Sequence, residues 1–137
     1  MKKFIALTGL LFTTAAAVHA QSKYNVVVAT LKLMGYSIGQ EWHSQLKEGQ
    51  YFTKEFTFNE GVNFDIIALS EDGDVQDVDM AIFNPGGERV AKDTRTDNYA
   101  EVNFTPSYTR DLTVEVKNYR SYTPNYASTV YFIVAYK

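Results

Sequence analysis

Cysteine is absent from the 137 residues of this chain. Disulfide bonds, a thiol nucleophile, a cysteine-ligated zinc or iron–sulfur site and a lipidated N-terminal cysteine are therefore excluded. Histidine is nearly as scarce, because the chain contains only His19 and His43. A transition-metal site needs several thiolate or imidazole ligands, so this composition argues against one.

The first twenty residues have the pattern of a secretory signal peptide. Met1-Lys2-Lys3 is a short basic start, Phe4 to Val18 carries no charge, and Val18-His19-Ala20 ends in small residues. The apolar stretch is shorter than the roughly 20 residues that a membrane-spanning helix needs. We therefore expect residues 1–20 to be cleaved, no transmembrane segment in the mature chain, and a periplasmic or secreted location.

Basic residues are outnumbered in the mature chain. Cleavage after Ala20 removes Lys2 and Lys3 from the 13 basic residues, which leaves 11 against 16 acidic residues and a net charge of −5. Nucleic-acid backbones are bound by stripes of basic residues, and no such stripe is visible in the sequence. Nucleic acid is therefore not an expected partner.

Residues 21–47 are predicted to form an N-terminal helix that packs on the rest of the protein. Between Tyr24 and Leu46 the apolar residues recur at steps of three and four: Val27, Leu31, Met34, Ile38 and Trp42. Ser22 and Asn25 are candidate caps for the start of this helix. His43 is placed near its C-terminal end, a favourable position for a histidine.

Beyond Gly49 the apolar residues alternate with polar ones, which is typical of β-strands. Ten Tyr and nine Phe give an aromatic share of 15%, and aromatic residues favour strands. Thr129 to Tyr136 is apolar on both faces and is predicted to be a central strand. Residues 48–137 are thus predicted to form an all-β domain, an antiparallel β-sandwich of jelly-roll type, with the N-terminal α-helix packed on it.

Several motifs occur in a characteristic order along this domain. They are Phe56-Thr57-Phe58, Glu60-Gly61-Val62, the run Asp77-Val78-Asp79-Met80-Ala81-Ile82-Phe83-Asn84-Pro85-Gly86-Gly87, and Phe104-Thr105-Pro106. This order resembles the bacterial pre-peptidase C-terminal (PPC) domain family, which is related to the collagen-binding domains of clostridial collagenases. The chain departs from the family pattern at Thr109-Arg110-Asp111-Leu112, where Gly-x-Tyr is common, and in its additional helix. The resemblance implies a secreted, non-catalytic accessory domain that acts in secretion, localisation or substrate binding.

The acidic run from Glu71 to Asp79 is the best candidate for a metal site. Calcium is held by clusters of oxygen ligands, and Asp72, Asp74, Asp77 and Asp79 are the candidate ligands. The spacing does not match an EF-hand loop. The alternative interpretation is a solvated acidic loop whose carboxylates bond to neighbouring backbone.

Tyr119, Tyr122 and Tyr126 fall in one short segment with Arg120, between the last two predicted strands. Tyrosine offers rigid contact area with a polar tip, and arginine adds a stacking or bidentate contact. These four residues are predicted to bind an exported protein or a polysaccharide. In the alternative interpretation the tyrosines fold back and cap the open end of the core.

No catalytic residue is predicted. No nucleophile-elbow motif accompanies His43, and Asp77 and Asp79 share one strand face rather than flanking a cleft as in glycosidases. We therefore predict an exported, non-enzymatic β-sandwich module with an accessory, inhibitor or chaperone-like role toward its partner. Two alternatives stay open, a calcium-dependent structural or adhesive module and, with the least support, a small hydrolase.

Overall fold

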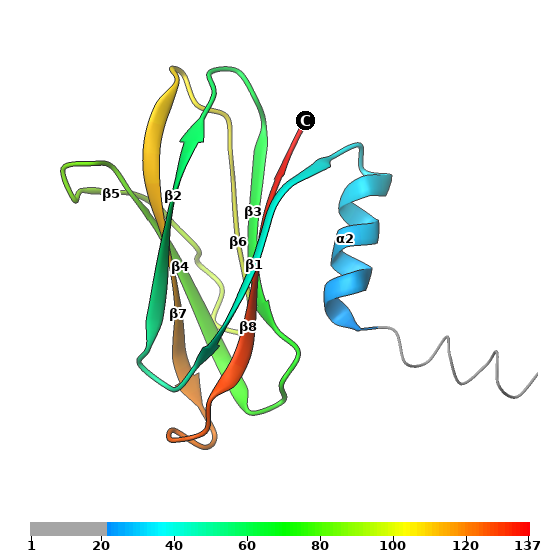
Figure 1. Cartoon of the computed structure of the whole chain (residues 1–137), viewed down its shortest axis with the longest axis vertical. Helices are drawn as coiled ribbons and strands as arrows, with labels where there is room; N and C mark the ends of the chain where they lie inside the picture. Colours follow the sequence, from blue (N-terminus) through cyan, green and yellow to red (C-terminus); the bar gives the residue numbers. More distant parts are fainter. Residues whose placement is uncertain (1–21) are drawn as a thin grey trace, which may run out of the picture.

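The computed structural model describes residues 22–137, so the predicted signal peptide lies outside the described residues. Within residues 22–137 one helix is followed by eight strands: α2 (Lys23–Leu33), β1 (Ser37–Leu46), β2 (Tyr51–Phe58), β3 (Phe64–Ser70), β4 (Val75–Phe83), β5 (Arg89–Lys92), β6 (Tyr99–Phe104), β7 (Arg110–Ser121) and β8 (Ser128–Tyr136). The strands form two antiparallel sheets with the orders β1-β8-β3-β6 and β2-β7-β4-β5, which face each other in Figure 1. This is the strand order of an eight-stranded jelly roll, so the predicted fold class is confirmed.

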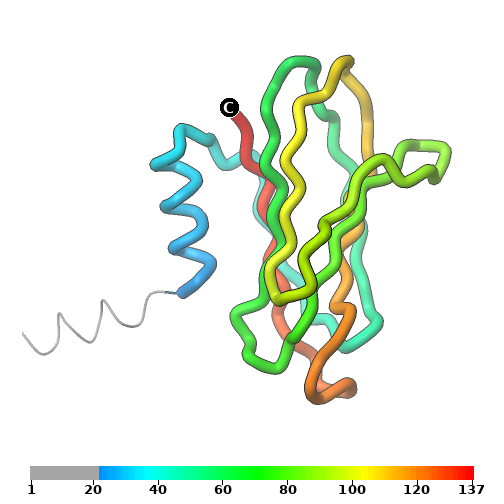
Figure 2. Tube along the Cα trace, turned by 180° about the vertical axis from the view of Figure 1, so that it is seen from behind, coloured from blue at the N-terminus to red at the C-terminus, as the bar shows by residue number. Residues whose placement is uncertain are grey.

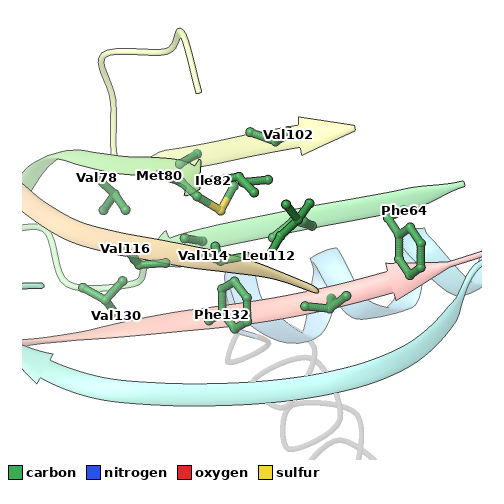
Figure 3. Packing of buried hydrophobic residues seen from close by; sticks show 14 of the residues in the cluster. Phe64, Val78, Met80, Ile82, Val102, Leu112, Val114, Val116, Val130 and Phe132 are labelled. Atoms are coloured by element: carbon green, nitrogen blue, oxygen red, sulfur yellow. The ribbon is translucent and has the colours of Figure 1, made fainter. Parts of the chain in front are cut away.

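The main core lies between the two sheets. Its side chains alternate with outward-facing ones along each strand, and Figure 3 shows Val78, Met80, Ile82, Leu112, Val114, Val116, Val130 and Phe132 meeting there. Phe132 is fully buried, with its ring stacked on Phe56 at 5.6 Å and edge-on to Phe52 at 6.1 Å. The period-two pattern of the sequence therefore marks the inner faces of the sandwich.

Helix α2 covers the outer face of the sheet that contains β1, as both whole-chain views show (Figures 1 and 2). Leu31 and Tyr36 pack there against Ile67 of β3 and Ile133 of β8, forming a second apolar cluster. This cover explains why β3 is buried at every position and why β8 is apolar on both faces. The predictions that β8 is a central strand and that the helix packs on the sandwich are both confirmed. Within residues 22–137 no helix is long and apolar enough to cross a membrane.

The predicted helix over residues 21–47 is too long, because α2 ends at Leu33. Gly35 has a φ of +88°, a left-handed conformation that glycine adopts without a steric penalty. The N–H of Gly35 donates to the carbonyl of Lys32, and the N–H of Tyr36 donates to that of Leu31. These two bonds form a Schellman motif, the usual way for a helix to end at a glycine. At the other end, the Ser22 side chain caps the helix by accepting from the N–H of Asn25 at 3.2 Å, as predicted.

Residues 37–46, predicted as helix, form the edge strand β1 instead. The strand pairs with β8 from Ser37–Tyr136 to Leu46–Ser128, with an irregularity at Gly39. Trp42 faces the gap between the sheets, where the ammonium of Lys54 lies 3.5 Å from its ring centroid. The sandwich therefore begins at β1 rather than at residue 48.

Candidate functional site

Tyr119 and Arg120 lie near the end of β7, where the strand contains a β-bulge. Asn118 is paired with Val78 of β4, but Arg120 is paired with Asp77, so Tyr119 is the extra residue. Tyr119 and Arg120 are both exposed, whereas Asn118 and Ser121 on either side are buried. The bulge thus turns two adjacent side chains toward solvent, whereas regular alternation would turn one of them inward.

A buried polar network holds the bulge in place. The Asn118 amide donates to the Leu46 carbonyl at 3.1 Å and to the Ser121 hydroxyl at 2.9 Å. The N–H of Ser121 donates to the Glu48 carboxylate at 2.8 Å. Buried polar groups that all have partners make a backbone segment rigid, so Tyr119 and Arg120 project from a fixed support.

The loop between β7 and β8 presents Tyr122 and Tyr126. Tyr119, Tyr122 and Tyr126 are 54%, 73% and 54% exposed, so the alternative in which they fold back on the core is wrong. Asp74 anchors this loop, because its carbonyl accepts from the N–H of Tyr122 and its carboxylate accepts from the N–H of Thr123, each at 2.9 Å. The predicted partner-binding residues Tyr119, Arg120, Tyr122 and Tyr126 are called the tyrosine surface below.

A polar groove of about 520 Å³ adjoins the tyrosine surface on the outer face of the sheet that contains β4. Its floor includes Asp79 of β4 beside Lys117 of β7, and Tyr119 lies at its border. The segment after β5 forms a wall, because the N–H of Asp93 donates to the Met80 carbonyl at 2.9 Å and keeps that segment beside β4. Figures 1 and 2 show the β4–β5 hairpin projecting from the sandwich at this side.

The groove has an acidic side. Burial, followed by the charge of Asp79, raises the pKa of Asp77, and the charge of Arg120 acts in the opposite direction. Burial, followed by the charge of Asp93, raises the pKa of Asp79, and Lys117 opposes this shift. The buried carboxylates Asp77 and Asp93 each have one oxygen without a hydrogen-bond partner. A buried carboxylate oxygen without a hydrogen-bond partner is energetically costly, and a cation or a donor such as a hydroxyl group would relieve that cost.

The four candidate calcium ligands do not come together as one cluster. Asp72 accepts from the N–H of Asp74 at 2.9 Å within its own turn, and Asp74 anchors the β7–β8 loop. Asp77 and Asp79 line the groove instead. Among the described residues, no three acidic or histidine side chains are close enough to hold a metal ion.

His43 is exposed on β1, not at the end of a helix as predicted. Its ring lies 5.9 Å from the ring of Tyr131. No hydrogen bond within residues 22–137 joins it to a serine or to an aspartate, so it lacks the partners of a nucleophilic triad in this arrangement.

Sequence reasoning missed Tyr51 and Lys117, which extend the outer face toward the edge of the sheet. Tyr51 of β2 is exposed and pairs with Lys117 of β7, whose ammonium lies 5.8 Å from the centroid of the Tyr119 ring. Both residues alternate with inward-facing neighbours, Phe52 and Val116. The same alternation that identified the core residues could therefore have assigned Tyr51, Lys117 and Tyr119 to one outer face.

Neither a protein-family model nor a curated protein matches the chain. Among solved structures, the pre-peptidase C-terminal domain of a collagenase from Bacillus anthracis is similar, with a TM-score of 0.49 and 22% identity over 71% of this chain and 89% of that one. The carbohydrate-binding module CBM36, solved in complex with calcium and xylotriose, has a TM-score of 0.33 and 16% identity over 74% of this chain and 91% of that one. The resemblance to the PPC domain that the motifs suggested is thus found in the structure comparison as well. It concerns the fold, and a fold does not by itself assign a function.

Proposed function

We propose that this chain is an exported, non-enzymatic binding module whose tyrosine surface recognises a protein or polysaccharide partner. The observation that carries this proposal is the exposure of Tyr119, Tyr122 and Tyr126, each by more than half. Tyr119 also borders the polar groove and rests on a support held by buried hydrogen bonds. A rigid aromatic side chain loses little conformational entropy when it is covered, which makes tyrosine effective in contact surfaces.

The adjoining groove supports the same proposal. The carboxylates of the groove and Lys117 can bond to hydroxyl or amide groups of a partner, while the ring of Tyr119 at its border can cover apolar parts of that partner. With a partner bound in this groove, the chain would act as an accessory subunit, an inhibitor or a chaperone for another exported molecule.

The experiment compares two variants of the mature protein. The test variant carries Tyr119→Ala, Arg120→Ala and Tyr122→Ala, and the control carries Tyr108→Ala, an equally exposed tyrosine (56%) that precedes β7 at the opposite end of that strand. Each is applied to an array of polysaccharides and used to capture proteins from the periplasm and medium of the source cells. We expect a partner that the wild-type and control proteins bind and that the test variant loses by tenfold or more. Unchanged binding by the test variant would show that the partner is recognised elsewhere.

Export is tested on the N-terminus of the protein. Cells that express the complete chain should yield a mature protein outside the cytoplasm that begins at Gln21, as read by intact mass spectrometry. An uncleaved chain that starts at Met1 would contradict the export part of the proposal and leave the binding part intact.

A calcium-dependent structural or adhesive role is the second candidate function. It is favoured by the buried carboxylate oxygens of Asp74, Asp77 and Asp93 that have no hydrogen-bond partner. The carboxylates of Asp77 and Asp79 on β4 and of Asp93 after β5 line this groove but are not close enough together to hold an ion in the described arrangement. A bound calcium ion would have to draw the segment after β5 toward β4. Calcium would then crosslink the floor and the wall of the groove.

Thermal unfolding with calcium, with magnesium and with a chelator tests this role. A ligand of the folded state adds about 2.7 kcal/mol at one hundred times its dissociation constant. The rise should be specific for calcium and should disappear in Asp77→Asn with Asp79→Asn, but not in Asp72→Asn, which bonds within its own turn. Equal melting temperatures in calcium and chelator would exclude this role.

A further inference from the structure

A second hollow lies between α2 and the edge strand β6, on the sheet opposite the one that carries the polar groove. It has a volume of about 610 Å³ and adjoins a smaller space of about 140 Å³, since Val26, Val27, Tyr99 and Glu101 line both. Together they have the size of a site for a small molecule. This hollow is called the helix groove below.

Asp65 forms the polar end of the helix groove. It lies on the outer face of β3 beneath α2, lines the smaller space, and is 4% exposed. Its Oδ1 atom is buried and has no hydrogen-bond partner. A buried carboxylate oxygen without a partner is costly when the group is ionised, so a donor or a cation placed here would stabilise the ionised form of Asp65.

A second carboxylate stands beside it. Glu101 of the neighbouring strand β6 pairs with Ile67, two residues along β3 from Asp65, and therefore lies diagonally across from it on the same face. Glu101 is exposed and lines both spaces. The pair thus consists of one buried and one accessible carboxylate.

Lys137, the cation whose charge acts on Asp65, makes its contacts elsewhere. Lys137 lies close enough for its charge to act on Asp65. Its ammonium group, however, donates to the Met34 carbonyl at 3.3 Å and lies 4.3 Å from the centroid of the Tyr36 ring. The Oδ1 atom of Asp65 is left without an internal partner.

We propose that the helix groove binds a small molecule that carries an aliphatic ammonium group on an apolar chain. The ammonium has three N–H donors and can bond to Asp65 and Glu101 together, while the apolar chain lies along Val26, Val27 and Leu69. A metal ion fits less well, because within residues 22–137 no third acidic or histidine ligand joins this pair. The site is separate from the tyrosine surface, so either proposal can fail without the other.

The carboxylate pair also predicts proton release on binding. Burial, followed by the charge of Glu101 and a hydrogen bond with its carboxyl group, raises the pKa of Asp65 to about 7. The titratable and charged groups around it are Glu101 and Tyr99 of β6, Tyr36 before β1, Lys137 after β8 and, along the larger space, Lys23, Arg95 and Asp97. The residues of α2 that line the smaller space are uncharged. An ammonium ion favours the ionised carboxylate, so binding should strengthen as the pH rises through about 7.

Three probes of equal length test the proposal on the purified mature protein: hexylamine, hexanol and hexanoate. Titrations are followed by amide chemical shifts in NMR at pH 6 and pH 8. We expect hexylamine to bind about tenfold or more tightly than hexanol, as for a hydrogen bond to a charged group. Hexanoate should bind least, and the hexylamine affinity should be higher at pH 8. Hexylamine binding no more tightly than hexanol would overturn the proposal.

Two isosteric variants locate the site. Asp65→Asn and Glu101→Gln should each weaken hexylamine binding by about tenfold, and Glu55→Gln, an exposed position on β2 in the other sheet, should leave it unchanged. If Asp65→Asn does not fold, the exposed Glu101→Gln variant still decides the test. The assignment would be refuted if the Asp65→Asn or Glu101→Gln variant folds and binds hexylamine with wild-type affinity. It would also be refuted if the chemical-shift changes are confined to the tyrosine surface.

Discussion

Replacing Asn118 with alanine would remove the side chain that joins the end of β1 to β7 beneath the tyrosine surface. Asn118 is fully buried, and its amide serves the Leu46 carbonyl and the Ser121 hydroxyl. Each net hydrogen bond contributes about 1 kcal/mol, and a buried group left without a partner costs about 1–3 kcal/mol. Asn118→Ala loses both bonds and leaves the Leu46 carbonyl without this donor, so we expect a loss of about 3 kcal/mol in the free energy of unfolding.

Urea unfolding followed by far-UV circular dichroism measures this loss. Ser121→Ala and the double variant are measured beside it, because Asn118 and Ser121 share hydrogen bonds. The double variant should lose less than the sum of the single losses, as expected for residues in contact. Asn125→Ala in the exposed β7–β8 loop is the matched control and should change stability by less than about 0.5 kcal/mol. A loss below about 1 kcal/mol for Asn118→Ala, or strict additivity, would refute the idea that this network holds the bulge.

Three other perturbations test the core, the helix end and the buried carboxylate. Phe132→Ala removes a fully buried ring that contacts Phe56 and Phe52, and urea unfolding should show a loss of about 3–5 kcal/mol. Gly35→Ala should lower the free energy of unfolding by about 1–2 kcal/mol. The left-handed backbone alone causes this loss, since no atom lies within 4 Å of the added Cβ. Gly73→Ala is the control, because Gly73 is equally open but has no positive φ, and it should cost less. Asp65 keeps its proton up to a pH of about 7 in the folded chain and loses it near 3.8 in the unfolded chain, so the folded state binds more protons between these values. Stability should therefore fall as the pH rises from about 4 to about 7; this slope should be absent in Asp65→Asn, and an identical slope in that variant would assign it to another group.

The sandwich could be predicted from the sequence because its core side chains alternate along each strand. The double-sided apolar pattern of residues 129–136 also identified the central strand β8, which is covered by the core on one face and by α2 on the other. Strand β1 could not be recognised in this way. Ile38 and Trp42 are spaced as in a helix, and their strand conformation depends on pairing with β8, almost one hundred residues away in the sequence.

The candidate site was predicted in part. Tyr119, Arg120, Tyr122 and Tyr126 were identified from their clustering, but the β-bulge that exposes Arg120 beside Tyr119 depends on contacts with Leu46 and Glu48. Local spacing carries no information about such contacts. The predicted calcium ligands fail for a different reason. Asp72, Asp74, Asp77 and Asp79 were grouped because they are close in sequence, but Asp72 and Asp74 lie in a turn, whereas Asp77 and Asp79 line the groove.

The two outer faces of the sandwich have different chemistry, and this difference decides where a partner can bind. Helix α2 covers apolar residues of β3 and β8, and between the helix and β6 lies a groove that ends in a carboxylate pair. The other outer face carries polar and aromatic side chains of β2, β4 and β7, with no helix over it within residues 22–137. A macromolecule needs a broad accessible face, whereas a small amine needs a narrow, partly buried cleft. Large and small ligands are therefore expected on opposite sheets, and each can be tested without disturbing the other.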